Sequence, residues 1–239
     1  MAKLDDLLQD LVTANRVLAD QGIVDSFGHV SIRSPNNPKR YFLSRARAPE
    51  RVELDDIMEF TLEGDPVDAK GRKPYLERFI HGAAYEARPD VMSVIHNHSP
   101  STIPYGITGR KMRPVMHMCG TIGYEVPIWD QHTKFGDTNL LVESMAMGRD
   151  LAKKLAKGRT ALMRGHGAIV VGHELRATVY TAVYLELNAK LQMQAENMSK
   201  KVKFLTKGEQ KKVADTTTPA NVNRAWENWC RAAGRPYKE

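Results

Sequence analysis

The chain has 239 residues, a formal net charge of +7 and only two cysteines, Cys119 and Cys230. This length is sufficient for a full hydrophobic core, no apolar run approaches the length of a membrane span, and two distant cysteines do not form a disulfide framework. The basic balance would suit nucleic-acid binding, but no motif for it is present. We therefore expect a cytoplasmic protein without membrane or nucleic-acid partners.

The first part of the chain is predicted to combine one helix with three strands. Leucine and valine recur at helical spacing over residues 4–18, which predicts an amphipathic helix and not a targeting segment. Two strands, 28–33 and 40–44, flank a polar turn and are expected to form a hairpin. A further strand is predicted at 57–62.

Next comes a helix that leads into a strand ending in two histidines. Pro74 suits the first turn of a helix, so we predict that a helix starts there and holds Glu77 in its first turn. The apolar run 91–95 predicts a strand that ends at His96 and His98. Because side chains alternate faces along a strand, His-x-His directs both imidazoles to one side, where they can bind one divalent metal.

A third histidine completes this candidate metal site. His166 follows the apolar run 160–163 and stands between two glycines, so its backbone can turn sharply. Glu77 would lie beside the three imidazoles as a fourth ligand or as a base that is released when substrate binds. Such a ligand set suits Mn²⁺, Zn²⁺, Co²⁺ or Fe²⁺ alike.

Two more helices are predicted, at residues 140–157 and from 175 to about 199. The mixed order of strands and helices indicates an α/β domain, which we place at residues 1–200. Lysines cluster after the last of these helices. We predict that residues 201–239 form a basic extension that packs on the domain or on a neighbouring subunit.

Several of these motifs together resemble the class II aldolase/adducin family over roughly residues 5–198. The resemblance is carried by Glu77 with its helix, by His96-Asn97-His98-Ser99-Pro100 and by Gly165-His166-Gly167, in the same order and spacing. It implies one three-layer α/β/α domain with a central, largely antiparallel sheet, usually assembled as a homotetramer with sites at subunit interfaces. It also implies that His96, His98 and His166 bind one divalent metal, and that Glu77 is the catalytic acid/base or a displaceable ligand.

The chain departs from the sugar-phosphate aldolases of that family where they bind phosphate. His29 replaces an asparagine, Tyr75-Leu76 replaces two serines, and Ser44-Arg45-Ala46-Arg47 introduces two arginines. Arginine binds carboxylates through paired, charge-assisted hydrogen bonds. The pattern is similar to the branch that decarboxylates hydroxylated aromatic dicarboxylates, such as dihydroxyphthalate and hydroxymethylpyridine-dicarboxylate. The expected substrate-binding residues are His29, Ser44, Arg45 and Arg47.

The sequence thus predicts a metal-dependent carbon–carbon lyase that decarboxylates a hydroxylated aromatic (di)carboxylate. Two alternatives stay open. One is an aldolase that acts on a non-phosphorylated hydroxy-keto acid, and the other is an adducin-like scaffold without catalysis, against which the complete set of Glu77 and three histidines argues. The remaining histidines, including His81, are expected to have structural roles.

Overall fold

A seven-stranded sheet runs through the centre of the protein in the order β3-β2-β1-β4-β7-β6-β5. The computed structural model describes residues 4–235. All neighbouring strands are antiparallel except the parallel pair β5 and β6. The strands are β1 (His29–Arg33), β2 (Arg40–Ser44), β3 (Ile57–Thr61), β4 (Ser93–Asn97), β5 (Ile128–Trp129), β6 (Thr160–Met163) and β7 (Gly167–Gly172). The predicted hairpin is the β1–β2 pair.

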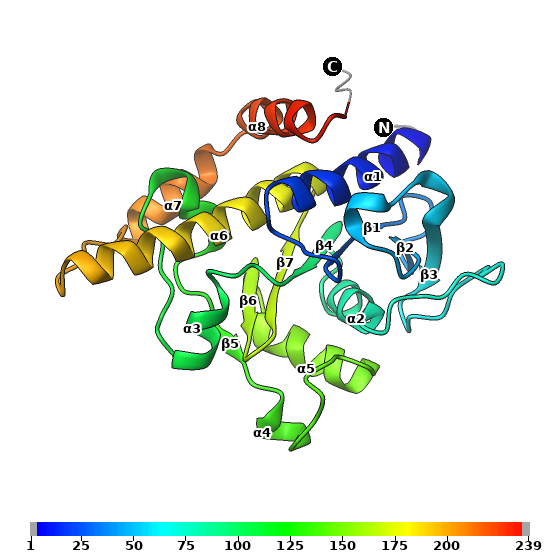
Figure 1. Ribbon diagram of the computed structural model, residues 1–239, viewed down its shortest axis with the longest axis horizontal. Helices are drawn as coiled ribbons and strands as arrows, with labels where there is room; N and C mark the ends of the chain where they lie inside the picture. Colours follow the sequence, from blue (N-terminus) through cyan, green and yellow to red (C-terminus); the bar gives the residue numbers. More distant parts are fainter. Residues whose placement is uncertain (1–3, 236–239) are drawn as a thin grey trace.

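Helices cover both faces of this sheet (Figure 1). They are α1 (Leu4–Asp20), α2 (Arg78–Ala87), α3 (Ile103–Thr108), α4 (His132–Phe135), α5 (Met145–Leu155), α6 (Leu175–Met198), α7 (Lys207–Thr216) and α8 (Pro219–Ala232). Helices α1, α6 and α8 share one hydrophobic core with the sheet, whereas α2 and α5 share the other. The predicted single α/β domain with a largely antiparallel sheet is therefore confirmed.

Apolar side chains point to both faces of the central strands, which explains why helices pack on both faces of the sheet. In β7, Ala168 and Val170 belong to the core beneath α6, while Ile169 and Val171 belong to the core beneath α2 and α5. Every residue of β4 is buried. A strand with apolar side chains on both faces is stable only between two layers.

Two predicted helix starts were wrong. Helix α2 begins at Arg78, because Pro74 instead forms a β-bridge with Arg45, and Glu77 occupies the position just before the first helical turn. Helix α5 begins at Met145, where the Ser144 side chain accepts the Met147 N–H. The residues before it form a loop in which Leu140 has φ +67°, a conformation that a helix cannot contain.

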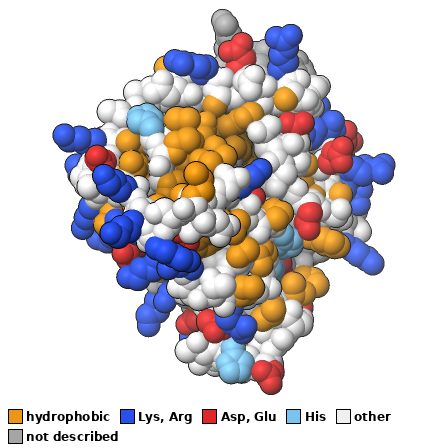
Figure 2. All heavy atoms as spheres, turned by 60° about the vertical axis from the view of Figure 1, so that its left-hand side comes forward, with side chains coloured by type: hydrophobic (Ala, Val, Ile, Leu, Met, Phe, Trp, Pro, Cys, Tyr) orange, Lys and Arg blue, Asp and Glu red, His pale blue; other side chains and the backbone are white. Residues whose placement is uncertain are grey.

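The C-terminal part of the described chain packs on the domain. Helix α8 contacts α6 and α1, and its Trp226 and Trp229 are buried in the same core as α6. Helix α7 lies on the short 3₁₀ segment at residues 117–122. Figure 2 shows hydrophobic side chains gathered on one area of the α6–α7 side, with lysine and arginine around it. Within residues 4–235, no helix is long and apolar enough to cross a membrane.

At Gly167 the start of β7 lies directly against the end of β4. A Cβ at this position would lie 2.0 Å from the Asn97 carbonyl oxygen and 3.1 Å from the His98 ring. Only glycine therefore allows the two strands, and the histidines at their ends, to lie this close together.

We expect Gly167→Ala to lower the free energy of unfolding by about 2 kcal/mol or more, because the added methyl group must push two backbones apart. Urea denaturation of the metal-free protein measures this loss. Gly208→Ala is the matched control, since a Cβ there meets only the Thr206 hydroxyl, at 3.9 Å, at the start of α7. Equal stability of the two variants would contradict the assigned role of Gly167.

Candidate metal centre

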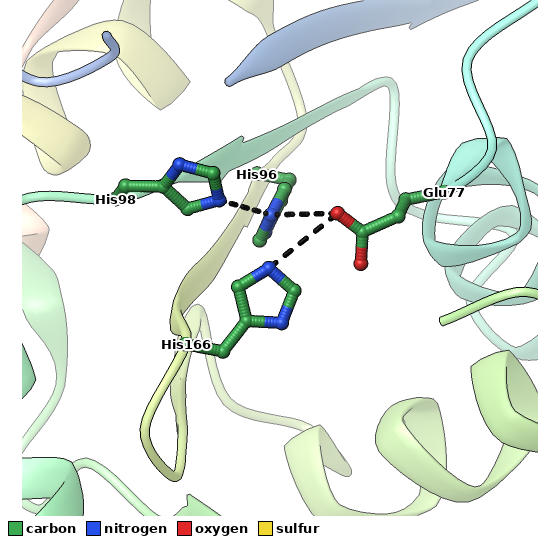
Figure 3. Close-up of side chains that lie close together, drawn as sticks. All are labelled: Glu77, His96, His98 and His166. Carbon is green, nitrogen blue, oxygen red and sulfur yellow. Dashed lines mark hydrogen bonds and ion pairs between the residues drawn. The ribbon is translucent and has the colours of Figure 1, made fainter. Parts of the chain in front are cut away.

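Four side chains from three parts of the fold converge at one end of the sheet (Figure 3). His96 stands near the end of β4 and His98 follows it, His166 lies in the turn between β6 and β7, and Glu77 immediately precedes α2. One ligand atom of each lies within 4.8 Å of the others. The structure thus brings together all four residues that the sequence singled out for metal binding.

The spacing of these atoms fits a single small cation. The Nε2 atoms of His96 and His98 are 3.1 Å apart, and Glu77 Oε2 lies 3.5 Å from His96 Nε2 and 3.4 Å from His166 Nε2. Metal–nitrogen bonds of about 2.0–2.1 Å in a tetrahedral site place neighbouring ligand atoms about 3.3 Å apart. The four residues fit a divalent metal of this size.

The opposite nitrogen of each imidazole is held by an acceptor. His96 Nδ1 faces the Ala168 carbonyl oxygen at 3.2 Å, and His166 Nδ1 faces the Leu140 carbonyl oxygen at 2.8 Å. His98 Nδ1 faces the Asp25 carboxylate at 3.2 Å. Because these acceptors require a proton on Nδ1, they leave the Nε2 lone pairs free, as metal-binding histidines need.

Asp25 and Leu140 are site residues that sequence reasoning missed. Asp25 has no motif around it, and Leu140 contributes only a backbone oxygen, so neither carries a sequence signal. Burial would raise the pKa of the Asp25 carboxyl, but hydrogen bonds from the Phe27 N–H and from His98 outweigh burial and lower that pKa. Asp25 is therefore ionised at neutral pH and is a strong acceptor for His98.

Glu77 is directed to the cluster and does not cap its helix. Its side chain makes no capping hydrogen bond, Oε1 accepts the Val142 N–H at 2.9 Å, and Oε2 faces His96 and His166. Burial would raise the pKa of this carboxyl, but the attraction of the two histidines is stronger and holds the pKa well below its usual range. Glu77 is thus a buried carboxylate that is already ionised.

His29 lies directly beside the metal cluster. It is the cross-strand partner of His96, and the two ring centroids are 5.1 Å apart. Tyr75 covers the other side of the region, with its ring centroid 4.5 Å from that of His29. His29 is 1% exposed.

The other expected substrate-binding residues form a separate group. Arg45 Nε and Arg47 Nη1 contact the two carboxylate oxygens of Asp56 at 2.5 and 2.7 Å. Ser44 is buried, and its hydroxyl donates to the Tyr75 hydroxyl at 3.4 Å. Tyr75 in turn donates to the Arg47 carbonyl oxygen. Tyr75 therefore lies between this group and His29, and Asp56 is a partner that the sequence did not indicate.

Comparison with known proteins identifies the family and agrees with this fold. The model described as Class II Aldolase and Adducin N-terminal domain matches residues 9–193. Decarboxylase tropJ of Talaromyces stipitatus is 30% identical, over 94% of this chain and 92% of its own length. The 3,4-dihydroxyphthalate decarboxylase of Arthrobacter keyseri is 24% identical, over 91% and 90%. The L-fuculose 1-phosphate aldolase from Glaciozyma antarctica PI12 has the same fold, with a TM-score of 0.75, 19% identity and coverage of 99% and 96%.

The chain belongs to the class II aldolase and adducin family. It is a lyase of this family with decarboxylases among its relatives. The four-residue cluster provides a possible metal site of the kind that such enzymes use.

Replacing His96, His98 or His166 by alanine should each weaken Zn²⁺ binding by about 100-fold or more, because two fixed imidazoles hold the ion far less well than three. Asp25→Ala should have a smaller effect, about tenfold, because it only orients His98. Competition with a metal-sensitive dye measures both. His132→Ala is the control, since His132, at the start of α4, is exposed and pairs with Asp137. Unchanged affinity in two of the three ligand variants would refute the site.

Proposed function

We propose that this protein is a divalent-metal-dependent lyase that removes CO₂ from a hydroxylated aromatic carboxylic acid. The observation that carries the proposal is the convergence of three imidazole Nε2 atoms and one carboxylate at a single point. Two relatives named as decarboxylases, each covering more than nine-tenths of this chain, support the choice of reaction. The proposed cation is Mn²⁺, Zn²⁺, Co²⁺ or Fe²⁺, all of which accept this ligand set.

When CO₂ leaves an aromatic ring carbon, the electron pair of the broken bond remains on the ring and must be stabilised. A divalent cation held by His96, His98 and His166 supplies a positive charge next to the substrate oxygens and stabilises the negative charge that develops there. The protein contributes a fixed and buried frame for this charge, because every Nδ1 atom of the three ligands is already engaged.

The ionised state of Glu77 decides its part in the reaction. Glu77 is ionised and its Oε2 atom faces the cluster, so it is positioned to accept the proton of the substrate's ring hydroxyl. It then delivers this proton to the ring carbon that bears the carboxylate. The ring becomes a ketone at the former hydroxyl carbon, the carbon–carboxylate bond breaks, and its electron pair returns the ring to an aromatic phenolate that takes a proton from water.

The surroundings of the cluster suit an aromatic ring. Tyr75 and His29 present aromatic surfaces next to it. Phe27 and Leu76 are 70% and 60% exposed although they are large and hydrophobic, and each is close in sequence to a residue of the site. An aromatic substrate, or a neighbouring subunit in the proposed cytoplasmic homotetramer, would cover such side chains.

We further propose that Arg45 and Arg47 attract a second carboxylate of the substrate, with His29 in contact with the substrate and Ser44 acting through Tyr75. Their side chains are 39% and 28% exposed. Asp56 neutralises one of the two positive charges, so the pair keeps a net charge of about +1 and unused guanidinium N–H groups.

Glu77→Gln should keep most of the bound metal and lose about 100-fold or more in kcat, the usual scale for a missing acid/base group. Glutamine has the shape of glutamate but cannot carry the proton. Single-turnover CO₂ release and elemental analysis of the same sample separate the two effects. Glu143→Gln, at an exposed position of the loop before α5, is the control. Turnover of Glu77→Gln close to that of the control would show that the carboxylate has no part in proton transfer.

The metal-loaded protein should release CO₂ from an ortho-hydroxy aromatic dicarboxylate and should not cleave L-fuculose 1-phosphate, because Tyr75 and Leu76 offer no pair of hydroxyl groups for phosphate. Arg45→Ala or Arg47→Ala should raise KM for the dicarboxylate about tenfold, or about 1.4 kcal/mol, since the arginines are partly exposed and shared with Asp56.

Two comparisons make this test specific. The same arginine variants should leave KM for a monocarboxylate analogue nearly unchanged. Arg40→Ala is the control, since Arg40 starts β2, the strand that precedes these two arginines, and pairs with Glu59 at 3.2 Å. Efficient cleavage of the sugar phosphate, together with no effect of the arginine variants on the dicarboxylate, would contradict the decarboxylase proposal and support an aldolase function.

A further inference from the structure

A chain of buried hydrogen bonds extends from His29 away from the metal cluster. His29 Nδ1 lies 2.6 Å from His81 Nε2, His81 Nδ1 lies 2.6 Å from the Ser31 hydroxyl, and Ser31 lies 2.8 Å from the Tyr85 hydroxyl. All four side chains are at most 1% exposed. The chain connects β1 with α2 on the face of the sheet that carries the cluster.

Both imidazoles of this chain are neutral. Each ring is at most 1% exposed, and among residues 4–235 no carboxylate pairs with either ring, so burial favours the neutral form of both. A neutral imidazole has one N–H and one bare nitrogen. The whole chain therefore has only two consistent arrangements, with every hydrogen pointing towards the metal cluster or every hydrogen pointing away from it.

Surroundings of Tyr85 select between these arrangements. Among residues 4–235, Ser31 is the hydrogen-bond partner of the Tyr85 hydroxyl, and a buried hydroxyl proton without an acceptor is costly, so Tyr85 donates its proton to Ser31. Ser31 then donates to His81 Nδ1, and His81 Nε2–H donates to His29 Nδ1. This leaves the single proton of His29 on Nε2, an atom with no hydrogen-bond partner in the described part of the chain.

We propose that Tyr85, Ser31 and His81 are positioning residues that fix His29 as the Nε2–H tautomer, a neutral hydrogen-bond donor aimed at a substrate oxygen beside the metal cluster. The identity of that oxygen rests on the proposed function, whereas the tautomer does not. A buried donor that needs no reorganisation stabilises negative charge on an oxygen as it develops. The three residues contact no substrate themselves.

The same chain does not act as a proton source. If His29 gave up its Nε2 proton, each hydrogen would have to shift by one position and leave a tyrosinate at Tyr85. Burial raises the pKa of the Tyr85 hydroxyl, so this buried anion is strongly disfavoured. His29 therefore holds its proton while Glu77 transfers one, which assigns the two groups different tasks.

The proposal is tested by measuring directly which ring nitrogen of His29 carries the proton. Long-range ¹H–¹⁵N spectra of histidine-labelled protein, recorded without metal and with Zn²⁺, show which ring nitrogen carries the proton, and His29→Asn assigns the signal. We expect His29 and His81 each to carry it on Nε2. A proton on His29 Nδ1 would overturn the proposal, whatever reaction the enzyme catalyses.

Tyr85→Phe removes the group that sets the direction. It should make the Nδ1–H form of His29 visible in the spectrum and lower kcat about five- to tenfold at unchanged Zn²⁺ content, the scale of one hydrogen bond. Tyr105→Phe is the matched control, because Tyr105 is equally buried and its hydroxyl donates to the Ala189 carbonyl oxygen at 3.0 Å, in the other core. A His29 tautomer that is unchanged in Tyr85→Phe would also overturn the proposal.

Discussion

Three imidazole lone pairs and one carboxylate are held within 4.8 Å of one another, and most of the local structure serves this constraint. Bare nitrogens that face each other at 3.1 Å are stable only if a cation or a proton lies between them. The fold prevents them from turning away, because carbonyl and carboxylate groups occupy the opposite nitrogens. The approach of β7 to β4 at Gly167 then sets how close the third histidine can come.

The two faces of the sheet have different tasks near this centre. The face beneath α6 is filled by aliphatic and aromatic side chains such as Val30, Ile95 and Val170. The opposite face carries His29, Ser31 and His96 at the positions between them, under α2. Since side chains alternate along a strand, one stretch of β1 and β4 supplies both the stabilising core and the polar site.

The metal cluster and the Arg45–Arg47 pair each contain a carboxylate that balances nearby positive charge. Glu77 balances the metal cluster, and Asp56 is shared by Arg45 and Arg47. Asp56 is 4% exposed and would be costly to bury alone, so the two guanidinium groups offset that cost while they stay partly in solvent. Tyr75 lies between the two groups, with its ring beside His29 and its hydroxyl donating to the Arg47 carbonyl oxygen.

The sequence by itself determined the motifs that carry the candidate metal ligands. These are His-x-His after an apolar run, a histidine framed by glycines, and Glu77 before a helix. It also determined the long helix α6 and the β1–β2 hairpin, because periodicity and turn residues are local properties. Tertiary structure alone decided that Asp25 supports His98, that Asp56 pairs with both arginines, and that His81 belongs to a chain behind His29. Asp25 and His81 are far in the chain from the histidines they contact, and although Asp56 is nearer to its arginines, a carboxylate has no pattern around it that marks its partner.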